Sequence, residues 1–147
     1  MALVKYNNNS ISAVTSAAAI PSGAMTHIKT LTASSSSTLS FVHGSSDVVL
    51  DSTYPIYVFK FINIHPATDG ARFTFNMSVD AGSNYNVVKT STLFQASHGE
   101  SGSDGALAYQ AGNDLAQSTD FQQLITNVGG DNDQCGSGIL TLFNPSS

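Results

Sequence analysis

The sequence predicts an all-β fold, and two observations support that prediction. Apolar and polar side chains alternate along several short segments, which is the period-2 pattern of a strand. Residues that favour tight turns, such as the pair Asp69-Gly70, separate these segments at short intervals. Apolar residues at helical spacing are not sustained anywhere, so we expect strands and turns throughout.

The composition is that of one ordered domain. A chain of 147 residues is long enough to bury a core of its own. Only 10% of the residues are charged, far below the usual quarter, and the polarity comes mainly from Ser, Thr, Asn, Gln and Gly. Eight Phe and five Tyr argue against a disordered chain.

The charges exclude two classes of partner. The formal net charge is −5, whereas nucleic-acid binding needs clustered Lys and Arg. The five basic residues are scattered singly along the chain: Lys5, Lys29, Lys60, Arg72 and Lys89. We therefore expect neither a nucleic acid nor an anionic membrane as partner. The N-terminus lacks the pattern of a signal peptide, and no apolar run reaches membrane-spanning length, so synthesis in a cytoplasm is expected.

The first 25 residues are rich in Asn, Ser and Ala and predict an extended N-terminal arm (1–25), followed by a β domain (26–147). Weak strand patterns come next, around the serine run 34–37. They cover Thr26–Thr32, Thr38–Val42 and Val48–Leu50.

The strongest segment, Ile56–Ile64, is apolar on both faces. Such a strand should be covered on both sides, or lie between a core and a partner subunit. Its aromatic face predicts a subunit interface formed by Tyr57, Phe59 and Phe61. The next segments, Arg72–Val79 and Tyr85–Phe94, follow turns at 65–70 and 80–84, so we expect a meander of three antiparallel strands.

The C-terminal half predicts fewer strands. Residues 97–118 are rich in Gly, Ser and Asp, so a loop with one short strand near Ala106–Gln110 is expected. Asp120–Val128 is interpreted as a strand in preference to a helical turn. Gly138–Phe143 is the last expected strand.

No motif indicates an enzyme, a metal or a cofactor. The segment 131–136 begins like a calcium loop, but Cys135 and Leu142 occupy positions that need oxygen ligands. The segment 80–84 fails in the same way. The four histidines lack zinc-pair spacing, and the lone Cys135 is interpreted as structural. Neither a nucleophile elbow nor a phosphate-binding loop is present. We therefore expect a non-enzymatic protein.

Sugar binding is a further candidate, because planar amides bind hydroxyls and tyrosine rings stack on sugar faces. The residues that suit a glycan or receptor contact are Asn84, Tyr85, Tyr109 and Asn113. The same residue types also favour turns, and that alternative stays open.

Two internal stretches and both ends of the chain carry a family resemblance. STYPIYVFKFINIHPATDGARFTF followed by DAGSNYN, together with the ends MALVKYNNNSISAVTSAAAIPSG and DNDQCGSGILTLFNPSS, resembles small virion structural proteins of marine tailed bacteriophages. That family is similar to antiparallel β-sandwich proteins of the jelly-roll kind in tail-fibre or other exterior virion positions. Its members continue past NPSS, so the resemblance implies a shortened chain or missing C-terminal strands.

The resemblance implies two functions. The first is a tail-associated or fibre-associated component on the virion exterior that contributes to host attachment, with other virion proteins, itself (as a homo-oligomer, for example a trimer) or a host glycan as partners. The second is a capsid decoration protein whose N-terminal arm clamps shell subunits. A glycan-degrading enzyme would need a carboxylate pair at a defined separation, whereas the available acidic pairs resemble turn residues.

Overall fold

The computed structural model describes residues 25–145, and within that range the protein is all-β, without a helix. The strands are β1 (Ile56–Ile64), β2 (Ala71–Phe75), β3 (Phe94–His98), β4 (Gly105–Tyr109), β5 (Gln122–Val128) and β6 (Gly136–Phe143). None of the described residues forms a helix that could cross a membrane. The arm expected at 1–25 lies outside the described residues, apart from Met25.

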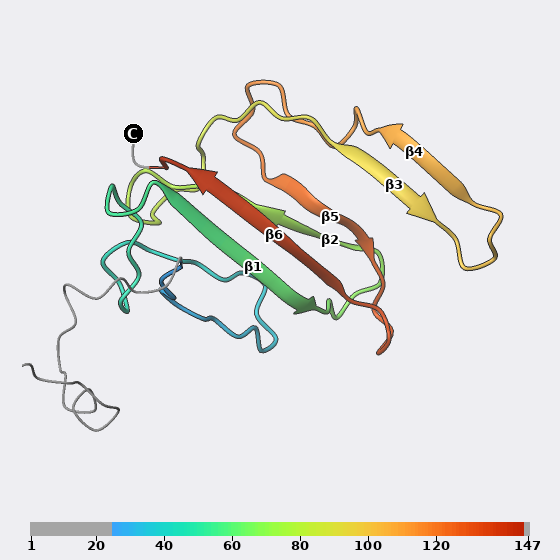
Figure 1. The fold of residues 1–147 in the computed structure, drawn as a ribbon, viewed down its shortest axis with the longest axis horizontal. Coiled ribbons are helices and arrows are strands. Elements are labelled where there is room, and N and C mark those ends of the chain that lie inside the picture. Colours follow the sequence, from blue (N-terminus) through green and yellow to red (C-terminus); the bar gives the residue numbers. More distant parts are fainter. Residues whose placement is uncertain (1–24, 146–147) are drawn as a thin grey trace, which may run out of the picture.

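The six strands form three antiparallel pairs nested inside one another: β1 with β6, β2 with β5, and β3 with β4. Ile56 is opposite Phe143, and Ala71 is opposite Val128. A bridge between Lys89 and Ser118 lies between the second and third pairs. The described chain is thus one long antiparallel ribbon that turns back on itself between β3 and β4 (Figure 1).

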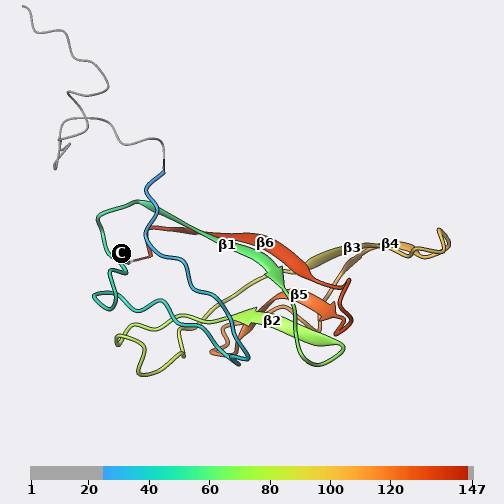
Figure 2. The ribbon, with the colours of Figure 1, turned by 90° about the horizontal axis from the view of Figure 1, so that it is seen from below.

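The expected three-stranded meander is therefore wrong. β1 does not pair with β2, because the connection after β1 carries the chain from one layer to another (Figure 2). The two strands meet through side chains instead, and the rings of Phe61 and Phe73 lie 4.8 Å apart. Their partner strands β6 and β5 also approach each other closely, since a Cβ added to Gly136 of β6 would lie 2.7 Å from Cδ1 of Ile125 in β5.

Two asparagines shape the ends of the paired strands. The register of β1 with β6 shifts between Phe61 and Ile64, and that of β2 with β5 shifts between Ala71 and Phe73. Asn63 and Asn127 lie at these irregularities with φ values of 54° and 54°. Asparagine tolerates this left-handed conformation better than most residues, so both positions suit a β-bulge.

Several predicted strands do not form. Thr26–Thr32, Thr38–Val42 and Val48–Leu50 have no strand assignment, and the segment 85–93 contains only the bridge at Lys89. A strand needs a neighbouring strand for its backbone hydrogen bonds, and alternation in one segment does not supply one. β3 begins at Phe94, the last residue of the expected strand Tyr85–Phe94, and continues to His98, inside the region 97–118 where mostly loop was expected.

The core of the described part is thin. Its buried apolar side chains are Val48, Tyr57 and Val128, and its buried polar side chains are Gln122 and Gln123. Phe41 and Phe59 contribute a half-buried ring contact at 5.4 Å. Many large apolar side chains remain exposed, so much of the apolar surface of the described part lies outside its core.

Candidate interaction surfaces

In residues 25–145, no group of three or more His, Cys, Asp and Glu side chains could hold a metal ion. His43 accepts a hydrogen bond at Nδ1 from the amide of Leu50, and His65 Nδ1 lies 2.6 Å from the carbonyl oxygen of Gln134. Cys135 is a free, exposed thiol. These contacts give the two histidines local structural roles.

The first pair of predicted glycan contacts belongs to the turn between β2 and β3. The amide and side chain of Asn84 both donate hydrogen bonds to the Asp80 carboxylate, at 2.8 and 2.6 Å. The hydroxyl of Tyr85 donates to Oγ of Ser40 at 2.8 Å, and its ring is half-buried. Both side chains thus make contacts within the chain.

The second pair lies around the end of β4. The hydroxyl of Tyr109 donates to the carboxylate of Asp114, and this hydrogen bond raises the pKa of Tyr109. Asn113 is half-buried, and its carbonyl oxygen accepts a hydrogen bond from Gln122. Among the described residues, no hydrogen bond or ring contact joins this pair to Asn84 and Tyr85. The structure thus does not bring the four residues together, and glycan binding stays a prediction.

Lowering the pH should weaken the fold through Asp80. Hydrogen bonds from Ser78 and Asn84 hold the pKa of Asp80 at about 2, below its ordinary 3.8, because they favour the carboxylate. The folded pKa is the lower one, so Asp80 stabilises the fold above about pH 4 and loses this contribution as the pH falls toward 2. The melting temperature, measured by circular dichroism, should fall less steeply between pH 4 and 2 in Asp80→Asn than in the wild type. Identical slopes in the two proteins would contradict this role of Asp80.

The predicted interface on β1 is directed toward the chain's own core. Tyr57 is buried, and the rings of Phe59 and Phe61 are half-buried against Phe41 and Phe73. Consecutive side chains of a strand point to opposite faces. The apolar face that β1 leaves uncovered is therefore the opposite one.

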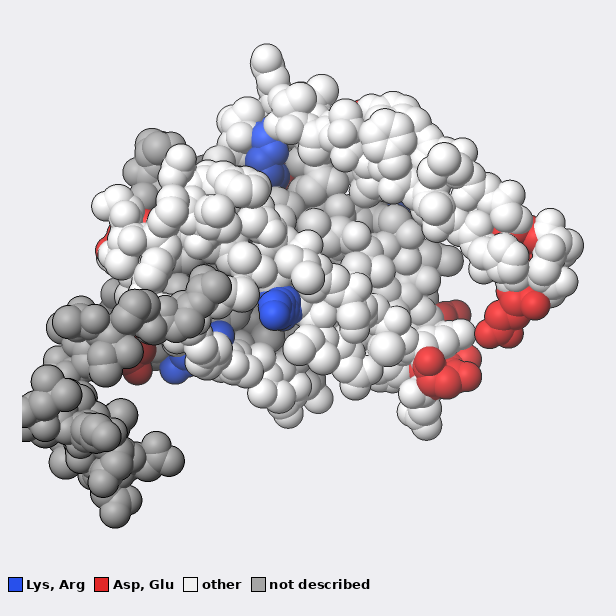
Figure 3. Space-filling view, viewed as in Figure 1, with Lys and Arg blue, Asp and Glu red and all other residues white. Residues whose placement is uncertain are grey.

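That opposite face, together with its counterpart on β6, is termed here the outer β1–β6 face. Directly paired residues of antiparallel strands share a face, which aligns Ile56 with Phe143 and Lys60 with Ile139. The exposed fractions of its large apolar side chains are Ile56 48%, Val58 38%, Ile62 76%, Ile139 68% and Phe143 71%. Lys60, opposite Ile139, is the only charged residue on this face. Figure 3 shows basic side chains in separate patches on this side of the molecule.

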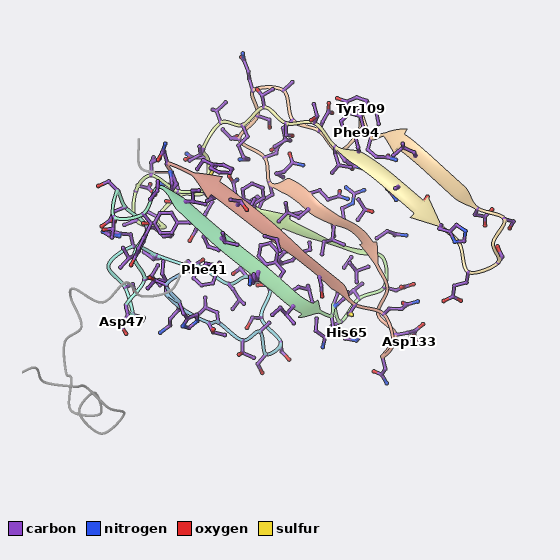
Figure 4. The ribbon with its side chains drawn as sticks, in the orientation of Figure 1. Phe41, Asp47, His65, Phe94, Tyr109 and Asp133 are labelled. Atoms are coloured by element: carbon purple, nitrogen blue, oxygen red, sulfur yellow. The ribbon has the colours of Figure 1, made fainter. Side chains whose placement is uncertain are left out.

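The β3–β4 pair is a hairpin that extends from the side of the body (Figure 2). All five residues of β4 are exposed. One side of the hairpin, termed the hairpin face, carries Phe94 beside Tyr109 and Ala96 beside Leu107. Figure 4 shows the two rings side by side, with centroids 5.4 Å apart. Phe94 is 69% exposed and Leu107 80%.

A shallow groove of about 280 Å³ lies between β3 and β5, where the hairpin leaves the body. It is lined by Leu93, Phe94, Gln95, Ala96, Leu124, Ile125 and Thr126. None of these side chains is titratable, so the groove offers a contact surface of mixed polarity without acid–base chemistry.

Comparisons with protein-family models, with curated proteins and with solved structures find no match for this chain.

Proposed function

We propose that the chain is a non-enzymatic structural component of the exterior of a tailed bacteriophage virion, associated with the tail or its fibres. The proposal starts from the resemblance carried by residues 52–86 and by both ends of the chain. It also uses the arrangement of the strands and the character of the exposed surfaces.

The nested strand pairing is the observation that supports the proposal most. A jelly roll is an antiparallel ribbon wound over itself into two facing sheets, so its strands pair in nested order. β1–β6 and β2–β5 pair in this order and lie in two layers (Figure 2). We therefore propose a jelly-roll-like β-sandwich, an architecture that is common in viral shell and lectin domains.

The surface supports an assembly role rather than catalysis. Monomeric proteins rarely expose contiguous apolar patches larger than a few hundred Å², and larger patches mark interaction sites. The outer β1–β6 face and the hairpin face each expose several large apolar side chains. Virion components bury surfaces of this kind against their neighbours in the particle.

A capsid decoration protein is the second candidate. Residues 25–145 form a short two-layered body with one projecting hairpin, and this part of the chain has no repeated unit that would build a shaft. Such a shape suits attachment to a shell lattice, whereas an independent fibre needs a long stalk.

Immunogold labelling of purified particles separates these candidates. An antibody raised against the full chain should label the tail, and the chain should co-purify with intact particles through a density gradient. Labelling spread over the head lattice would replace the tail assignment with decoration. If the chain is absent from particles, both virion assignments are wrong. A capsid-directed antibody serves as the control for head labelling.

A further inference from the structure

The outer β1–β6 face and the hairpin face are both exposed in the described part of the chain. From their chemistry we infer that they bind each other between copies: the hairpin face of one copy packs on the outer β1–β6 face of a second copy. This inference rests on the proposed virion role and extends it by naming a second copy of the chain as the partner.

The hairpin needs such a surface to be stable. A two-stranded hairpin is marginal in water unless it packs against another element. Every residue of β4 is exposed, and the ring pair of Phe94 and Tyr109 is the main contact across the hairpin face. Packing these rings and Leu107 on the aliphatic outer β1–β6 face would remove apolar area from water on both sides.

The charges of the two surfaces are complementary. The outer β1–β6 face carries one cation, Lys60, and no acid among the residues that form it. The hairpin tip carries Glu100 and Asp104, and residues 90–147 contain neither Lys nor Arg. In Figure 3 one group of acidic side chains lies at the right, over the hairpin tip and the turn before β6, and others lie at the left. Opposite charges at a contact guide its orientation and suppress wrong pairings.

A face-to-face contact between two outer β1–β6 faces fits less well. Two-fold symmetry would place the same patch on both sides, so Lys60 of each copy would enter an apolar contact that offers it no acid. It would also leave both hairpins uncovered. The hairpin-to-face contact covers both surfaces and pairs the lysine with acids.

A hairpin-to-face contact is heterologous, because each copy offers both surfaces and uses them on different neighbours. Successive copies then close into a ring or continue as a filament, according to the angle of each step. The chain in solution should thus form species larger than a dimer as its concentration rises.

Sedimentation velocity on the full chain, at concentrations up to about 100 μM, tests the contact. Ile62→Asp on the outer β1–β6 face and Leu107→Asp on the hairpin face should each weaken association about tenfold or more. Val79→Asp is the matched control, since Val79 is 87% exposed and belongs to neither surface. Its association should equal that of the wild type, and circular dichroism checks that each variant folds.

Mixing the two variants distinguishes the hairpin-to-face contact from a face-to-face one. Ile62→Asp retains an intact hairpin and Leu107→Asp retains an intact face, so an equimolar mixture should form a heterodimer that grows no further. A face-to-face contact predicts that Leu107→Asp associates like the wild type and that mixing restores nothing. Either of those results, or a wild-type chain that stays monomeric, would overturn the inference.

Charge reversal gives a test that avoids apolar substitutions. Lys60→Glu should weaken association, and adding Glu100→Lys and Asp104→Lys to the same chain should restore it at least in part. An unchanged or further weakened association in the triple variant would count against the pairing. The association measurements use the purified chain, whereas the labelling uses virus particles. Failure of the hairpin-to-face contact can therefore be distinguished from failure of the proposed virion role.

Discussion

Tyr57→Ala is expected to lower the free energy of unfolding by about 3–5 kcal/mol, because it removes a large buried aromatic side chain. Tyr57 is 3% exposed, and its ring lies 5.8 Å from that of Tyr54. Its hydroxyl donates to the carbonyl oxygen of Asp51 at 2.8 Å and accepts from the amide of Asp51 at 3.1 Å. The side chain therefore joins β1 to the segment before it.

Two further variants separate the contribution of the Tyr57 hydroxyl from that of its ring and provide a control on the same strand. Tyr57→Phe keeps the ring and leaves the two backbone groups of Asp51 without their partner, which should cost about 1–2 kcal/mol. Val58→Ala, on the exposed side of the same strand, should cost less than about 1 kcal/mol. Urea unfolding followed by fluorescence measures all three. A loss in Tyr57→Ala no larger than that in Val58→Ala would show that β1 has been assigned the wrong inward face.

Gln122→Ala is expected to cost about 2–3 kcal/mol, because it leaves buried polar groups without partners. The Gln122 carboxamide accepts a hydrogen bond from the hydroxyl of Ser91 and donates to the carbonyl oxygens of Asn113 and Gln123. Ser91 also exchanges hydrogen bonds with Leu115. One buried side chain therefore holds together the two segments that connect the hairpin to the body.

The matched control is Gln95→Ala, a half-buried glutamine on β3 whose substitution should change stability by less than about 0.5 kcal/mol. Hydrogen exchange gives the sharper readout for Gln122→Ala. Amides of residues 89–91 and 115–118 should lose protection before those of β1 and β6. Equal loss of protection throughout the chain would mean that Gln122 does not act on the connecting segments.

Local patterns predicted part of the strand content but not the strand partners. Ile56–Ile64 was predicted with the bounds that β1 has, since alternation and the following His65-Pro66 define both its faces and its end. Its partner β6 is more than 70 residues away in sequence, at Gly136–Phe143. Alternation identifies which side chains share a face, but it contains no information on which strand lies alongside. The meander prediction was wrong because it paired each strand with its neighbour in sequence.

The candidate interface shows the same limit. Ile56–Ile64 was correctly predicted to be apolar on both faces, but its pattern alone could not say which face would meet the core. The contacts of Phe59 and Phe61 with Phe41 and Phe73 decide that, and they join segments far apart in sequence. The exposed Ile139 and Phe143 become part of the surface only through their pairing with β1.

The central claim is that this chain is an exterior virion component that works by packing against its neighbours. A cryo-electron microscopy reconstruction of purified particles tests it most directly. The expected result is density for the two-layered body on the outside of the tail, with protein covering the outer β1–β6 face. A particle map that lacks this density, or one in which that face is open to solvent, would contradict the claim.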